Sequence, residues 1–158
     1  SLMQYYTFIR PKELMLLRAG DISVKEQTVF VSHSFSKNRK DGKATLPARV
    51  SRLMIELGVL SHHSDCFLFS KGFMPGERQR DSRSITNRWK EIRKALGFPS
   101  CYQFYSLKDT GITDAIGTVG LTVAMDQARH SDISITNKYV AKDQLHAHPE
   151  LKNFEGNL

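Results

Sequence analysis

Two short apolar segments joined by a basic loop constrain the fold more than any other part of this sequence. The runs TVFVS (28–32) and KATLP (43–47) have the length of strands and are bounded by turn residues. Asp41-Gly42, just before the second run, is a dipeptide typical of hairpin turns. A shorter alternating pattern begins at Ile22 and predicts another strand. We therefore expect a small antiparallel sheet of three strands, with a positively charged loop between the last two.

Helical periodicity predominates in the rest of the chain. In SITNRWKEIRKAL, the apolar residues at positions 85, 89, 92 and 96 fall on one face of a helix. Other helices are expected at 2–9, 11–20, 48–60, 106–118, 121–129 and 133–140. The predicted fold class is therefore α+β and mainly helical, with the small antiparallel sheet as its only β-structure.

The size and charge of the chain limit its partners. A chain of 158 residues suits one domain with a single core. It has 23 Lys and Arg residues against 16 Asp and Glu residues, which gives a net charge of +7 and a pI near 9.5. Such a surface favours a polyanion, most often a nucleic acid, although a merely basic protein would have the same composition.

Several kinds of protein are not indicated by the sequence. No apolar run approaches the length of about 20 residues that is needed to cross a membrane. Cys66 and Cys101 share no motif, which indicates reduced thiols in a cytoplasmic protein. No cluster of metal ligands and no phosphate-binding loop is visible, so we expect neither a metal nor a nucleotide cofactor.

The stretch HSDISITNKY places His130 and Tyr139 nine residues apart. On one unbroken helix this spacing would turn the two side chains through roughly 900°, so that they would face opposite ways. Ser131-Asp132 favours a helix N-terminus over a helix interior, however. We therefore predict a break at this dipeptide and a new helix that carries Tyr139, which would let both side chains face one target.

Two further sites with charged residues lie at expected helix starts. Arg10 precedes Pro11, which can open a helix, and free backbone N–H groups at such a start favour an anion. The segment SLKD (106–109) has the form of a helix cap, with Tyr105 and Lys108 beside the start of the helix. Each residue alone also has an ordinary explanation as a surface or core residue.

Taken in order, four phrases resemble the motifs of the tyrosine recombinase catalytic domain, in the phage integrase family. RPKELMLLRAGDI resembles the family's first box, and SKNRKDGKATLP resembles its lysine hairpin. FYSLKDTGIT falls where the family has its His-x-x-Arg box. ARHSDISITNKYV resembles the last box, in which a histidine precedes the nucleophilic tyrosine by nine residues. The resemblance covers most of the chain, from about Leu2 to Val140.

The resemblance implies a function and a role for each matching residue. The function is site-specific DNA recombination, in integration or excision of a mobile element, with strand cleavage and rejoining through a 3′-phosphotyrosyl intermediate and no cofactor. Tyr139 would be the nucleophile, and Arg10 and His130 would bind the phosphate. Lys37 would be the general acid, with Lys40 and Lys43 as nearby contenders.

The sequence departs from the family at three places. Tyr105 stands for the box histidine, and Lys108 stands for the box arginine. Lysine keeps the charge but loses the planar bidentate fork of arginine, so reduced activity is implied. Ala128-Arg129 replaces the family's usual Leu-Gly. Two alternatives stay open: a catalytically impaired DNA-binding relic of the same fold, and an enzyme that relaxes DNA like type IB topoisomerases.

The resemblance also implies an organisation and a set of partners. The catalytic domain is expected at 1–140, without the family's N-terminal DNA-clamping domain, and a tail at 141–158 would be exchanged between subunits. The partner would be double-stranded DNA in the bacterial nucleoid, on which the protein would form a homo-tetramer, while the isolated fragment would be a monomer. The residues expected to bind DNA are Arg39, Lys40, Lys43, Arg88 and Arg129.

Overall fold

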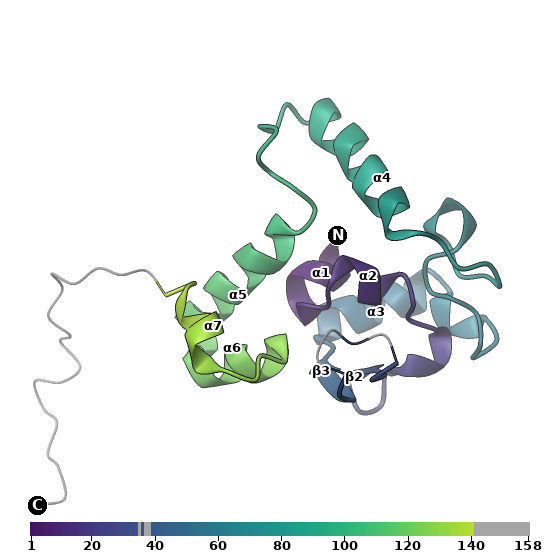
Figure 1. Ribbon diagram of the computed structural model, residues 1–158. Helices are drawn as coiled ribbons and strands as arrows, with labels where there is room; N and C mark the ends of the chain where they lie inside the picture. The colour runs from purple at the N-terminus through teal and green to yellow at the C-terminus, as the bar shows by residue number, and fades with distance from the viewer. Residues whose placement is uncertain (35, 37–38, 141–158) are drawn as a thin grey trace, which may run out of the picture.

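The computed structural model describes residues 1–34, 36 and 39–140 (Figure 1). Two expectations therefore lie outside the described residues: the general acid Lys37 and the tail at 141–158. Helices make up most of the regular structure, and a small antiparallel sheet accompanies them, which confirms the predicted fold class.

The elements follow one another mostly where the periodicity predicts them. The helices are α1 (Leu2–Thr7), α2 (Pro11–Leu14), α3 (Ala48–Glu56), α4 (Ser82–Ala95), α5 (Ser106–Val119), α6 (Leu121–Ala128) and α7 (Ile133–Asn137). The strands are β1 (Ile22–Ser23), β2 (Thr28–Val31) and β3 (Gly42–Thr45). Short 3-10 turns occupy Ala19–Asp21, Val59–Ser61 and Lys71–Phe73.

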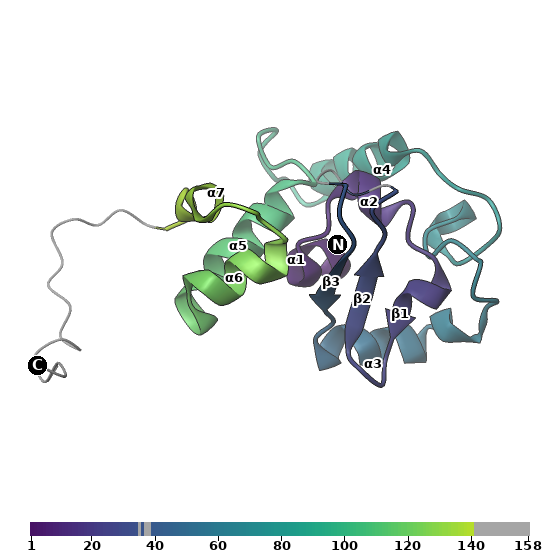
Figure 2. The ribbon, with the colours of Figure 1, turned by 60° about the horizontal axis from the view of Figure 1, so that its bottom comes forward.

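The sheet has the order β1-β2-β3 with antiparallel neighbours, as predicted (Figure 2). Thr28 pairs with Thr45 and Val31 pairs with Gly42, so the basic loop joins the ends of β2 and β3. Val29 and Val31 are fully buried, whereas Phe30 between them is exposed. This alternation puts one face of the sheet on the core and leaves the other to solvent.

The helix expected at 11–20 is much shorter than its apolar pattern predicts, because it ends at Leu14. The chain after it pairs with a distant segment. The Leu68 N–H donates to the Leu17 carbonyl (2.9 Å), and the Ala19 N–H donates to the Cys66 carbonyl (2.8 Å). These tertiary hydrogen bonds replace the helical ones. The Leu17 side chain is therefore buried in the core from a segment that is no longer helical.

Two apolar clusters hold the molecule together. The larger cluster joins the sheet to α2, α3 and α4, and the smaller cluster joins α1 to α5, α6 and the segment after α7. A Cβ atom at Gly111 of α5 would lie 2.0 Å from the Tyr5 carbonyl oxygen of α1. The two helices therefore cross at close backbone contact (Figure 1).

The outer edge of β3 is covered by the end of α6. The Gln127 amide accepts the Thr45 N–H (2.8 Å) and donates to the Thr45 carbonyl (2.9 Å). It also donates to the Tyr6 carbonyl (3.0 Å). A single side chain therefore connects the sheet, α1 and α6.

Candidate active site

Arg10 lies at the start of α2 and is folded back onto its own helix. Pro11 begins the helix, and Arg10 before it has an extended backbone (φ −68°, ψ 150°). The Arg10 N–H donates to Glu13 Oε2 (3.1 Å), and its Nη1 donates to Glu13 Oε1 (3.1 Å). The position predicted for the first arginine is thus confirmed as a helix start.

Glu13 binds two guanidinium groups at once. It is almost completely buried, and it accepts Nη1 of Arg10 on one carboxylate oxygen and Nη2 of Arg129 on the other. Sequence reasoning missed this residue, although its spacing three residues after a helix start is a known capping signal. The carboxylate fixes two arginines that are far apart in the sequence.

Lys108 is fully buried beside these arginines. Its Nζ has no hydrogen-bond partner among the described residues, and it lies 6.0 Å from the centre of the Tyr105 ring. Burial first, and then the charges of Arg10 and Arg129, lower the pKa of Lys108 to about 7. A buried ammonium group among cations is unfavourable unless an anion joins it.

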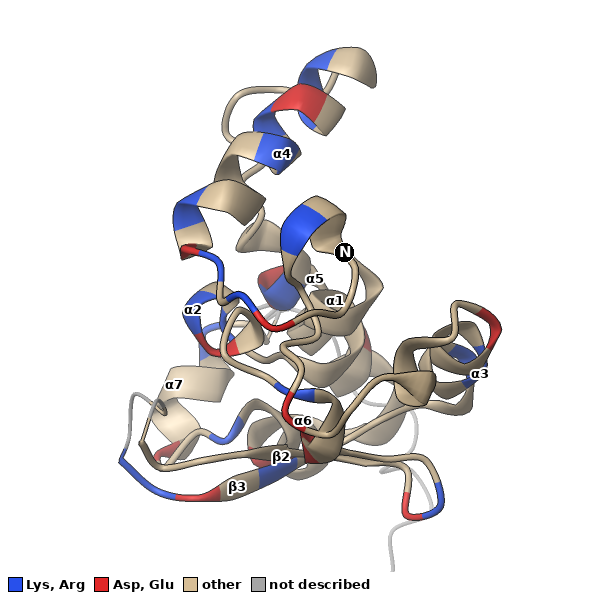
Figure 3. Ribbon diagram, turned by 90° about the vertical axis from the view of Figure 1, so that its right-hand side faces the viewer, with Lys and Arg blue, Asp and Glu red and all other residues tan. Residues whose placement is uncertain are grey.

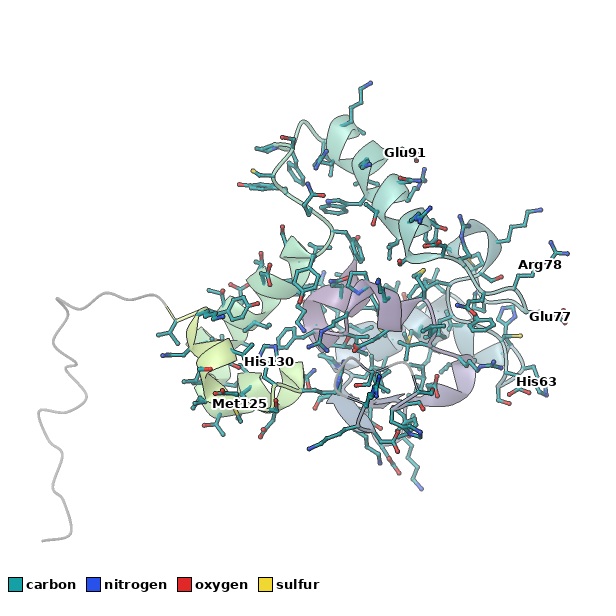
Figure 4. All side chains as sticks on the ribbon, viewed as in Figure 1. His63, Glu77, Arg78, Glu91, Met125 and His130 are labelled. Atoms are coloured by element: carbon teal, nitrogen blue, oxygen red, sulfur yellow. The ribbon has the colours of Figure 1, made fainter. Side chains whose placement is uncertain are left out.

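His130 is also buried next to the cations, between α6 and α7 (Figure 4). Its Nδ1 is 2.8 Å from Oγ1 of Thr136, a fully buried residue that sequence reasoning missed. Burial first, and then the charges of Lys108, Arg10 and Arg129, lower the pKa of His130 to about 4. The imidazole is therefore neutral near pH 7, and its N–H is a hydrogen-bond donor.

Tyr139 lies just beyond α7, so the prediction of a helix through this residue is wrong by about one turn. Its N–H donates to the Thr136 carbonyl (3.0 Å). The predicted break at Ser131-Asp132 is confirmed, because the Asp132 carboxylate accepts the Ser134 N–H (2.8 Å) and caps α7. The break lets Tyr139 turn back toward α5.

The Tyr139 hydroxyl donates to Oδ1 of Asp109 (2.8 Å). Burial raises the pKa of Tyr139, and the hydrogen bond to Asp109 raises it further. The expectation that SLKD caps a helix is wrong, since α5 begins at Ser106 without a side-chain cap and Ser106 Oγ accepts the Gln103 N–H (3.1 Å). Asp109 binds the tyrosine instead, a role that its sequence position does not reveal.

The remaining candidate residues lie at the edge of this group or outside it. Tyr105 is partly exposed; burial raises its pKa, and the neighbouring Arg10 opposes this effect. Arg39 and Lys40 are exposed in the basic loop, and Lys43 pairs with Glu26 (3.5 Å). Arg88 is bound to Glu91 (2.7 Å) on α4, a helix that carries several basic residues (Figure 3), and Glu91 lies well away from His130 (Figure 4).

The structure thus brings together residues from three distant parts of the sequence. The group consists of Arg10, Glu13, Tyr105, Lys108, Asp109, Arg129, His130, Thr136 and Tyr139. Among the described residues, no group of three or more His, Cys, Asp or Glu side chains is placed to hold a metal ion. Within the same ranges, no helix has the length and apolar character to cross a membrane. Chemically, the group is a largely buried cluster of cations beside a tyrosine hydroxyl.

Comparison with known families identifies the class of protein. The phage integrase family matches residues 1–146, and the chain belongs to this family. No curated protein matches the chain.

Several solved structures have the same fold. The XerA recombinase is similar with a TM-score of 0.71 and 20% identity, over 87% of this chain and 50% of that one. The Tn1549 transposon integrase in complex with transposon right end DNA gives a TM-score of 0.73 with 13% identity, over 94% and 54%. A lambda integrase dimer bound to a COC′ core site gives 0.65 with 13% identity, over 92% and 52%. The chain therefore spans about half the length of these proteins.

Proposed function

We propose that this chain is the catalytic part of a site-specific DNA recombinase that cleaves and rejoins strands through a 3′-phosphotyrosyl intermediate. The observation that carries the proposal is the position of Tyr139 beside a buried cationic group. The charge of Arg10 acts on the pKa values of Tyr139, His130 and Lys108 alike, so these groups share one site.

The arrangement suits in-line attack on a phosphodiester. The Tyr139 oxygen forms a bond to phosphorus, and the bond from phosphorus to the 5′-oxygen breaks. Asp109 holds the phenol proton in the ground state and is placed to accept it as the oxygen attacks. Arg10 and His130 donate to the nonbridging oxygens, where negative charge grows in the transition state.

Protonation of the 5′-oxygen completes the cleavage step. We assign this proton to Lys37, which lies outside the described residues, with Lys40 and Lys43 as the alternatives nearby. Attack by a 5′-hydroxyl on the phosphotyrosine reverses the step and restores free Tyr139. The bond energy is kept in the covalent intermediate, so the reaction needs no nucleotide cofactor.

Charge and family support DNA as the substrate. The net charge of +7 favours a polyanion. Two similar structures, the Tn1549 integrase and lambda integrase, are complexes with DNA. We propose that Tyr105 and Lys108 border the scissile phosphate and that Arg39, Lys40, Lys43, Arg88 and Arg129 bind the DNA backbone. We further propose tetramer assembly on DNA and a role in integration or excision of a mobile element.

A second candidate is a DNA-binding relic that does not cleave. Lys108 at the usual arginine position favours it, because a lysine lacks the bidentate geometry that suits a phosphate. The raised pKa of Tyr139 also favours the relic, because a protonated tyrosine is a weak nucleophile and attacks only when a base accepts its proton.

A covalent-trapping experiment separates the two candidates. The full-length protein is incubated with nicked suicide DNA that carries the recombination site, and the products are run on a denaturing gel. We expect a protein–DNA adduct that Tyr139→Phe abolishes while duplex binding by gel shift is unchanged. Binding to that DNA by gel shift without any adduct would show that the protein is the relic.

A further inference from the structure

Arg129 has a backbone conformation that ordinarily belongs to glycine. It ends α6 with φ 54° and ψ 43°, in the left-handed region. Glycine is the usual residue at such a helix end, because a side chain is strained there. A strained residue that persists in an active site is grounds to look for the function of its side chain.

The Arg129 side chain runs inward past Gly42 of β3, which has no side chain to block it. A Cβ atom at Gly42 of β3 would lie 2.6 Å from Cδ of Arg129, so the arginine fits only against a glycine. The side chain is 11% exposed and ends on Glu13 of α2. Three elements therefore hold the guanidinium group at Glu13, beside that of Arg10.

The charged groups around this guanidinium carry a net positive charge, which favours the binding of an anion. Arg10, Arg129 and Lys108 lie around Glu13, and Asp109 is engaged by the Tyr139 hydroxyl. Lys108 Nζ is completely buried and has no hydrogen-bond partner within the described ranges. Three cations against the two carboxylates of Glu13 and Asp109 leave one positive charge, which the single negative charge of a phosphate diester balances while its oxygens accept from the cations.

We propose that Arg129 supplies the second guanidinium group to the scissile phosphate, in place of the arginine that Lys108 replaces. The inference rests on the proposed recombinase function and deepens it. A guanidinium has five N–H donors in a planar fork, so one group can bind a carboxylate and a phosphate together. Lys108 then adds a positive charge beneath the phosphate.

The test removes the guanidinium and returns the backbone to glycine in one change, Arg129→Gly. The probe is inorganic phosphate, added to the full chain without DNA and followed through the imidazole NMR signals of His130. We expect affinity to fall by about 10- to 100-fold, the usual effect of losing one charged hydrogen-bonded contact. The His130 signals also report whether the variant is folded.

A second variant moves the guanidinium back to the position that the family uses. Lys108→Arg in the Arg129→Gly background should recover most of the phosphate affinity, because the deleted side chain leaves room for the larger group. In the background with Arg129 present, the same substitution should give little gain. A purely structural Arg129 would not be rescued in this way.

Two controls isolate the effect. Gln27→Gly relieves another left-handed residue (φ 51°) in an exposed turn, and Arg83→Gln removes a charge from a side chain that is 89% exposed. Neither should alter phosphate binding. Unchanged affinity in Arg129→Gly, or no phosphate binding by the wild type at millimolar concentrations, would overturn the inference. Phosphate binding that behaves as expected in a protein that never forms a DNA adduct would instead contradict the proposed function.

Discussion

At the scale of single residues, the contact between Tyr139 and Asp109 sets the state of the proposed nucleophile. The Asp109 carboxylate accepts a hydrogen bond from the phenol hydroxyl (O···O 2.8 Å), and this bond adds to burial in raising the pKa of the tyrosine. A second pair has the same chemistry elsewhere, because the Tyr5 hydroxyl donates to Oδ2 of Asp114 (2.5 Å) and the pKa of Tyr5 is raised to about 12. The two pairs provide a matched experiment.

Asp109→Asn should lower the pKa of Tyr139, since a neutral amide no longer disfavours the tyrosinate. The measurement is an ultraviolet titration of tyrosinate, with the Tyr139 signal identified by subtraction of a Tyr139→Phe titration. Asp114→Asn is the control: it should lower the pKa of Tyr5 and leave that of Tyr139 in place. A Tyr139 pKa that does not move in Asp109→Asn would show that burial alone sets it.

At the scale of elements, the close crossing of α1 and α5 fixes how the segments that carry Arg10 and Lys108 are placed. Gly111→Ala puts a Cβ atom against the Tyr5 carbonyl, and backbone cannot yield as a flexible side chain can. We expect the free energy of unfolding to fall by about 1–3 kcal/mol, as for other overpacked sites. Urea denaturation measures the change.

Gly117→Ala is the control on the same helix. A Cβ atom at Gly117 meets nothing within 4 Å, so this change should stabilise the protein by up to about 1 kcal/mol through helix propensity. Opposite signs for the two substitutions would confirm that the crossing, and not the helix, is the sensitive feature. Equal effects would contradict it.

The elements were predictable where the sequence pattern is local. The sheet and α4 follow from alternation, periodicity and turn residues within a few positions. The end of α2 was not predictable, because its apolar spacing fits a longer helix equally well. The chain after α2 leaves the helix because it forms backbone hydrogen bonds with the segment at 64–68. That segment is distant in the sequence, so its effect on Leu17 is not visible locally.

At the scale of the whole molecule, the buried cations should make stability depend on pH. The pKa of Lys108 is lowered from 10.5 to about 7 and that of His130 from 6.5 to about 4. Between the folded and unfolded pKa of each group, the unfolded chain binds more protons than the folded one. Stability should therefore rise with pH from 4 to 6.5 through His130 and above 7 through Lys108.

Lys108→Met isolates the lysine contribution. At pH 7 the variant should be more stable than the wild type, because it buries no ammonium group. The difference should shrink by pH 9.5, where the folded wild type holds a neutral lysine. Urea unfolding at the two pH values measures it; a difference that is constant with pH would mean that Lys108 titrates normally. The window stays below pH 10, where Tyr5 begins to oppose the trend.

In the candidate site, as in the helices and strands, the sequence predicts what depends on local motifs and not what depends on contacts between distant residues. That Arg10, His130 and Tyr139 come together was predictable, because the order of their motifs resembles a known family. Glu13, Asp109 and Thr136 were not, since each is an ordinary polar residue until its partner is known. The inward path of Arg129 depends on the absence of a side chain at Gly42, which no reading of either residue alone reveals.

The cover over β3 has a consequence for the life of the protein in a crowded cell. An open edge strand is a template on which other chains add strands and grow into fibres. Here Gln127 takes both backbone groups of Thr45, and Arg129 lies across Gly42 at the other end of the strand. The same turn of α6 that carries a proposed phosphate ligand thus also covers an edge on which another chain could add a strand.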